Sequence, residues 1–246
     1  CIVAKIFGSE AQKEAAIELV MKTHGGRSFL HGHLFSDNVH EYLAPCIYEG
    51  EGEMLGMAFL KSLVKQHGTT FFEPIGRSLS ELGVQRPQFT NPRHLWTLKG
   101  PLTAYAAWWA GRCIPGSAAA LPALPADLRE HVEFAAAQLP RSAREISGMM
   151  RKHQLKLADR QCRMSEVSSR VQKLVVILCT ALYAADQEDE VVRGAADLLC
   201  QDLRRELNGQ RPTDRYYRQV TQLGESIVDG GFRSIAELKP EEILMR

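Results

Sequence analysis

Apolar residues recur at helical spacing along much of the chain. From Glu53 to His67 they fall three or four positions apart, which predicts a helix with one buried face. A second run, from Val167 to Leu182, follows the same spacing and predicts the core helix of the C-terminal half. Alternation of apolar and polar residues with a period of two is absent over any useful length. The sequence therefore predicts an all-α fold.

Glycine and proline residues predict where the other helices end. The opening segment should be helical to about Thr23 and end at the Gly25-Gly26 pair. A short helix ahead of Pro45 should stop at that residue, because proline lacks the N–H that continues a helix. Asp127 is the expected N-cap of a long helix. Further helices are predicted over residues 92–113, 127–151, 188–207 and 213–228.

The turn-forming residues divide the chain into two helical parts. Residues 69–91 contain two prolines and two glycines, and we expect a linker with one helical turn there. This gives a first helical domain over residues 1–68 and an additional one over residues 92–246. The helical pattern is already in progress at Cys1, without a signal sequence, so we expect the chain to be part of a longer protein.

Net charge and cysteine spacing indicate which partners and which cellular compartment to expect. Lys and Arg total 30 against 29 for Asp and Glu, so no net field draws the chain towards nucleic acid. The six cysteines show no CxxC spacing, which favours the cytoplasm or another reducing intracellular compartment. The longest apolar stretches are interrupted, and we expect no transmembrane segment.

Two short motifs carry the candidate chemistry. Residues 23–29 read THGGRSF, and residues 46–50 read CIYEG. They resemble two linked motifs of the acyl-CoA dehydrogenase superfamily, a Gly-Gly turn that ends one helix and an acid-Gly turn that starts the next. The spacing from Phe29 to Glu49 matches the family without a gap. The resemblance covers about the first 65 residues, and residues 157–182 resemble the extra helical domain of very-long-chain members.

The resemblance implies that Glu49 is the catalytic base of a flavin-dependent enzyme of fatty acid β-oxidation. In the family, the acid at this turn removes the α-proton of a fatty acyl-CoA thioester, and the β-hydrogen leaves as hydride to FAD. The electrons then pass to electron-transfer flavoprotein or a similar acceptor. Because the α-proton is a very weak acid, the carboxylate has to be desolvated and aimed at it, and we expect Glu49 to be buried beside Tyr48.

The resemblance also implies which residues contact FAD and that the protein is a homo-oligomer. Gly25 and Gly26 would lie against the FAD of a neighbouring subunit, and Gly50 would lie beside the flavin. Lys22 stands where the family has glutamine, and Glu51 stands where it has threonine. Both remain expected cofactor-binding positions, since the Lys22 cation can offset an acid near a pyrophosphate.

Two other functions stay open. An acid after the acid-Gly pair also occurs in acyl-CoA oxidases, so Glu51 is compatible with an oxidase-like enzyme that passes electrons to oxygen. Alternatively, the chain is a helical interaction scaffold that has lost catalysis. For the enzyme, we expect the chain to be inactive alone, because the family's missing domains supply most of the pocket.

Histidines and basic residues suggest two further sites. His24, His31, His33 and His40 could converge on a metal ion, but no cysteine or carboxylate pattern accompanies them, and we expect a polar loop without a metal. The basic stretch 151–163 is interleaved with Asp159 and followed by Glu166, and it predicts a solvated helix face. Peripheral contact with membrane headgroups is the alternative.

Overall fold

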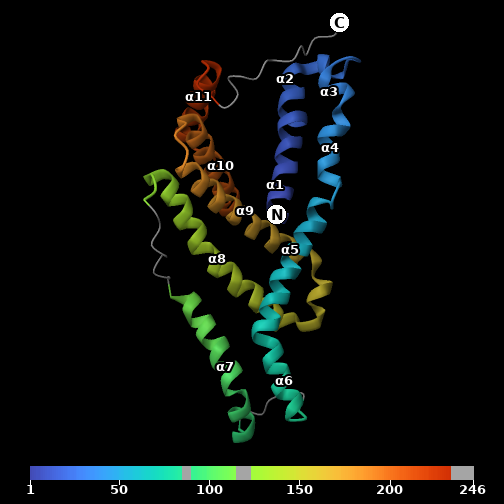
Figure 1. Cartoon of the computed structure of the whole chain (residues 1–246), viewed down its shortest axis with the longest axis vertical. Coiled ribbons are helices and arrows are strands. Elements are labelled where there is room, and N and C mark those ends of the chain that lie inside the picture. The colour runs from blue at the N-terminus through green and yellow to red at the C-terminus, as the bar shows by residue number, and fades with distance from the viewer. Residues whose placement is uncertain (85–89, 115–122, 234–246) are drawn as a thin grey trace.

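The computed structural model describes residues 1–84, 90–114 and 123–233, and these residues form an all-α fold with no strand among them (Figure 1). Most of the predicted helices are confirmed, with ends within a few residues of those expected. The longer helices are α1 (Ile2–Lys13), α4 (Val39–Ile47), α5 (Gly52–His67), α6 (Glu73–Glu81), α7 (Pro92–Cys113), α8 (Ala126–His153), α9 (Gln161–Ala185), α10 (Glu190–Asn208) and α11 (Asp214–Val228). Two short ones are α2 (Lys22–His24) and α3 (Leu34–Asp37).

Helix α9 forms the centre of the bundle, as its apolar spacing predicts. It packs against α5, α8 and α10, and its apolar residues fill the space between them. Ile177 and Val167 are fully buried on this helix. In Figure 1, α9 extends from beside α10 to α5, so helices from both halves of the chain share the core.

The N-terminal segment is one long helix that packs beside α4 and α5. A segment with wider, π-type turns (Glu14–Met21) joins α1 to α2, so the helix is continuous from Ile2 to His24. Helix α4 returns alongside it (Figure 1), and the Cys46 thiol donates to the Ser9 carbonyl oxygen at 3.3 Å. This antiparallel pair places the end of α4 near the start of α1.

The predicted stop at Pro45 is wrong. Helix α4 passes through this residue and ends at Ile47. Proline removes only one backbone donor, and the following turn still closes, because the Tyr48 N–H bonds to the Ala44 carbonyl at 2.9 Å. A proline in the last turn of a short helix is therefore tolerated here.

The first half of the predicted linker is also more helical than expected. Gly68–Phe72 continues α5 with π-type turns, and α6 follows directly. Pro74 lies in the first turn of α6, where a missing N–H costs little. Phe71 packs against Trp108 of α7, with ring centroids 5.3 Å apart, which holds this segment on the bundle. The domain boundary at residues 69–91 stays a prediction.

Asp127 is not an N-cap. Helix α8 begins one residue earlier, at Ala126, and its N-cap residue is Pro125, which makes no side-chain capping bond. Asp127 instead lies in the first turn, where the helix dipole favours its negative charge. Most of the predicted connector ahead of it, residues 115–122, lies outside the described residues.

Within the described part of the chain, α9 is long and apolar enough to cross a membrane by length and composition. Its most apolar window has a mean hydropathy of 1.3, with 39% of that window buried. The core helix of a bundle meets the same criteria, and the contacts of α9 with α5, α8 and α10 are those of a core helix.

Arg163, in the predicted basic stretch, is paired with an acid. It donates to Glu145 at 2.7 Å, and Arg170, which lies beyond that stretch, donates to the other oxygen of the same carboxylate, also at 2.7 Å. Exposed pairs of this kind contribute little stability, but they do keep charge balanced on the surface. Contact of this face with a membrane stays a prediction.

Candidate functional site

The predicted catalytic residue lies in a tight turn between α4 and α5. Tyr48 is extended, and both Glu49 and Gly50 have positive φ angles, 60° and 110°. Glycine is favoured at the second position because a φ of 110° strains any residue with a side chain, and a Cβ there would also stand 2.8 Å from the Leu55 Cδ2 atom, so that the Leu55 side chain would have to move. The left-handed backbone at Glu49 is rare for a residue with a side chain and marks a constrained turn.

Lys5 of α1 holds this turn from the side. Its ammonium donates to the Gly50 carbonyl oxygen at 2.5 Å. Lys5 could not be predicted for this role, because 45 positions separate the two residues and no motif links them. The Lys5 ammonium is bound to the backbone, and the Glu49 carboxylate has no ion pair among the described residues.

Glu49 is exposed, contrary to the burial expected of it. Tyr48 beside it is also exposed, at 69%. Both border a hollow of about 350 Å³ between α1 and the end of α4, whose floor includes Gly8 and Ser9. In this structure the hollow can admit part of a ligand to the carboxylate, but the described residues do not exclude water from it.

Glu51 has a structural role that the sequence analysis missed. Its carboxylate accepts hydrogen bonds from the Glu53 and Met54 N–H groups, at 2.9 and 3.1 Å, and so caps α5. These two bonds hold the pKa of the Glu51 carboxyl below its usual value. The acid therefore points at its own helix, and the signal for this was its position directly before the helical run.

The Gly-Gly turn ends the first helix as predicted. Gly25 has a φ of 61°, which terminates α2, and the chain continues in a short 3-10 turn to Phe29. Ser28 is fully buried, and its hydroxyl donates to the Gly25 carbonyl at 2.7 Å. Lys22, one turn earlier, is exposed and pairs with Glu18 at 2.5 Å.

The imidazole rings of His24 and His33 pack against each other and against Phe35. The His24 and His33 ring centroids lie 5.4 Å apart, and Phe35 packs against both. His33 is buried, and its Nδ1 atom accepts from the Phe35 N–H at 3.2 Å. Within the described ranges, no group of three or more His, Cys, Asp or Glu residues is arranged to hold a metal ion.

The two motifs lie at opposite ends of the α1–α4 pair. Gly50 contacts Lys5 near the start of α1, whereas Lys22 and Gly25 lie at the far end of the same continuous helix (Figure 1). At 1.5 Å per residue, the helix separates them by roughly 25 Å. One chain therefore does not bring Glu49 and the Gly-Gly turn together around one ligand.

The cofactor implied by the resemblance is FAD, and the Gly-Gly turn fits its close approach. Gly25 and Gly26 are exposed, with nothing within 4 Å of the place a Cβ would occupy. Lys22 could reach a phosphate there only by leaving Glu18. Glu51 already accepts two backbone hydrogen bonds, so it offers no free donor or cation to a nucleotide.

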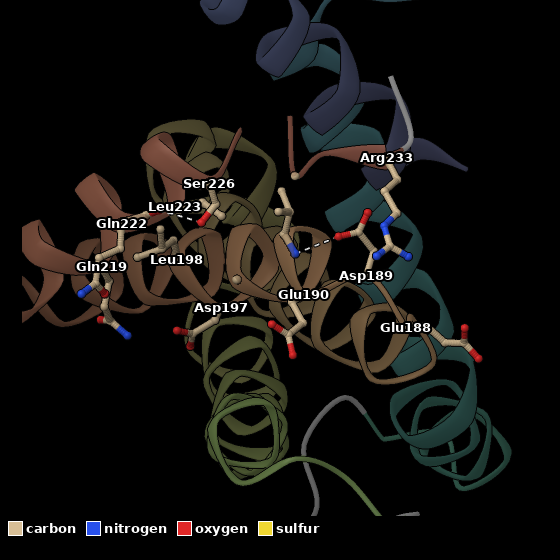
Figure 2. Close-up of a pocket in the computed structure, with 13 residues that line it drawn as sticks. Glu188, Asp189, Glu190, Asp197, Leu198, Gln219, Gln222, Leu223, Ser226 and Arg233 are labelled. Atoms are coloured by element: carbon tan, nitrogen blue, oxygen red, sulfur yellow. Dashed lines mark hydrogen bonds between the residues drawn. The ribbon is translucent and has the colours of Figure 1, made fainter. Parts of the chain in front are cut away.

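A second hollow lies between α10 and α11 (Figure 2) and is rich in acidic residues. Asp189 caps α10 by accepting from the Val191 N–H at 2.8 Å, and Glu190 lies in the first turn of that helix. Asp197 belongs to a buried network with His131. Asp189, Glu190 and Asp197 thus have structural partners or a place at a helix start, Glu188 is exposed, and the acids of this hollow do not form a metal-binding group among the described residues.

Comparison with known proteins identifies no relative. No protein-family model matches this chain, no curated protein matches it, and no solved structure matches it. The functional interpretation therefore depends on the residues of the two motifs and on the geometry of the turns that carry them.

Proposed function

We propose that this chain supplies the catalytic acid turn of a flavin-dependent acyl-CoA dehydrogenase, with Glu49 as the base. The observation that supports it is the constrained turn itself. Glu49 has a left-handed backbone, is followed by a glycine whose φ of 110° disfavours any side chain, and forms no ion pair among the described residues. A carboxylate that only capped a helix would not need this geometry, and Glu51 already caps α5.

The reaction assigns a separate task to each group of this chain. The Glu49 carboxylate takes the α-proton of a fatty acyl-CoA thioester. Its backbone N–H, fixed by the turn, donates to the thioester carbonyl oxygen and stabilises the developing enolate. FAD, when bound, accepts the β-hydride. Lys5 keeps the turn in place through the Gly50 carbonyl.

The exposure of Glu49 adds a requirement to the proposal. A solvated carboxylate is a poor base for so weak an acid, so the hollow beside Tyr48 has to be closed by substrate, cofactor and further protein. The separation of the two motifs within one chain adds a second requirement. The Gly-Gly turn and the acid turn of one chain would serve different flavins, so that each flavin would contact two copies, which suits a homo-oligomer. The chain by itself is then expected to be inactive.

The test uses the protein expressed from its complete gene. Visible absorbance is recorded for the wild type and for Glu49→Gln, before and after anaerobic addition of a long-chain acyl-CoA. Bleaching of an oxidised-flavin spectrum in the wild type, and none in the variant, supports Glu49 as the base. A flavin that bleaches equally in both would refute that role.

The scaffold alternative is favoured by two specific contacts. Lys22 is engaged by Glu18, and Glu51 is engaged by its own helix, so two of the positions expected to contact FAD have other partners. A protein that is colourless and takes up no added FAD would establish this alternative. Reduced flavin that reoxidises rapidly in air would instead indicate the oxidase-like enzyme, while slow reoxidation and reaction with a protein acceptor indicate the dehydrogenase.

A further inference from the structure

A cavity of about 630 Å³ lies between α5, α7, α8 and α9, away from the acid turn. Its volume falls within the range of about 300–1,000 Å³ that small-molecule sites occupy. His67, at the cavity, and Glu49 lie at opposite ends of α5, roughly 20 Å apart at the rise of a helix. The apolar residues that line the cavity are Phe59, Leu63, Phe71, Trp108, Leu139, Ala143, Ile146, Val171 and Val175.

Helices α5 and α8 each line part of this cavity. Helix α5 contributes residues from Phe59 to His67, and α8 contributes residues from Leu139 to Ile146. Each of these runs covers about two helical turns, or roughly 10–12 Å. An apolar lining of this size can enclose a flexible alkyl chain.

Among the described residues, a single cation lines the cavity, and no Asp or Glu lines it. The cation is Arg112, near the end of α7. Its guanidinium stacks 4.5 Å from the centre of the Trp108 ring and donates to the Trp108 carbonyl at 3.4 Å. In the part of the chain that the structure describes, no carboxylate forms a salt bridge with Arg112, so its charge is unbalanced there.

His67 is the other titratable residue of the lining, and its surroundings keep it neutral. Its Nε2 atom lies 2.9 Å from the Ser147 hydroxyl, which lies 2.7 Å from the Tyr105 hydroxyl. Burial lowers the pKa of His67, and the nearby Arg112 charge lowers it further. The electrostatic character of the cavity is therefore set by Arg112.

We propose that this cavity binds the carboxylate of a fatty acid, with the alkyl chain between α5 and α8 and the carboxylate on Arg112. The match is one of charge and polarity. A fatty acid supplies one negative charge to an unpaired guanidinium and one apolar chain to an apolar cavity. A cationic amphiphile would be repelled by Arg112, and an uncharged one would leave that charge unused. The proposal does not depend on Glu49 or on FAD.

The probe for the test is dodecanoate, used below its micelle concentration and titrated by calorimetry into the protein from its complete gene. Dodecanol and dodecyltrimethylammonium are the uncharged and cationic controls. We expect saturable binding of one dodecanoate per cavity, with weaker binding of the alcohol and none of the cation. Arg112→Gln should weaken dodecanoate binding about tenfold or more, because a charge-assisted hydrogen bond is lost, and should leave dodecanol binding unchanged.

The matched control is Arg151→Gln. Arg151 also stacks on a tryptophan, 4.8 Å from the ring centre of Trp109, but it does not line the cavity, so dodecanoate binding should be unchanged. Ala143→Trp should block dodecanoate and dodecanol alike, with circular dichroism showing that the helices persist. Glu49→Gln should bind dodecanoate as the wild type does. Equal binding by wild type and Arg112→Gln, or equal binding of all three amphiphiles, would overturn the proposal.

Discussion

The Lys5 ammonium donates to the Gly50 carbonyl oxygen at 2.5 Å, across the contact between the first helix and the turn that carries Glu49. Because the donor is charged and partly buried, this hydrogen bond is stronger than one between neutral groups. It fixes the turn to α1 independently of the helices on either side. The position of Glu49 is therefore set by three elements: the end of α4, the start of α5 and α1.

Gly50→Ala should destabilise the protein by about 1–3 kcal/mol. The backbone at this position has a φ of 110°, and an added Cβ would stand 2.8 Å from the Leu55 side chain. Both the backbone strain and the Leu55 contact act on the folded state. The midpoint of urea unfolding should therefore fall, without a change in the slope of the unfolding free energy against urea concentration. Gly76→Ala is the matched control. Gly76 lies in the interior of α6 with nothing within 4 Å of a Cβ. That change should stabilise the protein by about 0.5–1 kcal/mol, and equal losses in both variants would contradict the argument.

Glu51→Ala should cost about 0.5–1 kcal/mol, because it removes the cap of α5. The Glu53 and Met54 N–H groups would then lose their shared acceptor. Glu51→Ser should recover most of the loss, since a serine hydroxyl at the N-cap accepts the same kind of bond. Glu53→Ala takes a carboxylate from the same turn without removing a capping bond, so its effect on the urea midpoint should be smaller. A larger loss in Glu53→Ala than in Glu51→Ala would contradict the assignment of the cap.

Local sequence signals predict the helices well where they agree with one another. Helix α7 runs from Pro92 to Cys113 as predicted, because Asn91 caps it and Pro92 occupies its first turn. The failures are places where packing overrides a local signal. Pro45 was expected to end α4, and residues 69–91 were expected to be mostly linker, but α4 continues to Ile47 and residues 69–81 are helical, each in contact with neighbouring helices.

The candidate site was predictable only in part, for a similar reason. The motif locates Glu49 in a turn before a helix, which the structure confirms. The exposure of Glu49 and the hydrogen bond from Lys5 to the turn depend on which helix packs beside the turn. Sequence spacing carries no such information. The cavity at Arg112 was missed for the same cause, since its lining is assembled from segments spread between residues 59 and 175.

Cys200 should resist thiol reagents while the protein is folded. Its side chain is fully buried, burial raises the pKa of the thiol to about 12, and the thiolate is the reactive form. Cys162 and Cys179 are exposed and should react readily. The measurement is mass spectrometry after brief treatment with iodoacetamide at mild alkaline pH, with and without urea. Labelling of Cys200 in the folded protein at the rate of Cys179 would contradict the burial.

A buried network joins α8 to α10 and should make stability depend on pH. The Asp197 carboxylate lies 2.8 Å from His131 Nε2 and accepts from Gln201 at 2.8 Å. Arg204 donates to His131 Nδ1 at 3.0 Å, so Nε2 carries the proton and donates to Asp197. Burial acts to raise the pKa of Asp197, but the hydrogen bonds from His131 and Gln201 outweigh it, and the pKa is lowered.

A carboxyl with a lowered pKa stabilises the fold above its ordinary pKa of 3.8 and loses that contribution as the pH falls through its lower, folded-state value. The free energy of unfolding should therefore decline below about pH 4. Asp197→Asn should cost about 1–3 kcal/mol at neutral pH, because it replaces a charged acceptor of two buried bonds. It should also flatten the decline in acid, so that variant and wild type converge as the pH falls. Urea unfolding at a series of pH values measures both effects, and a constant difference between the two proteins across the acid range would show that the charge of Asp197 does not stabilise the fold.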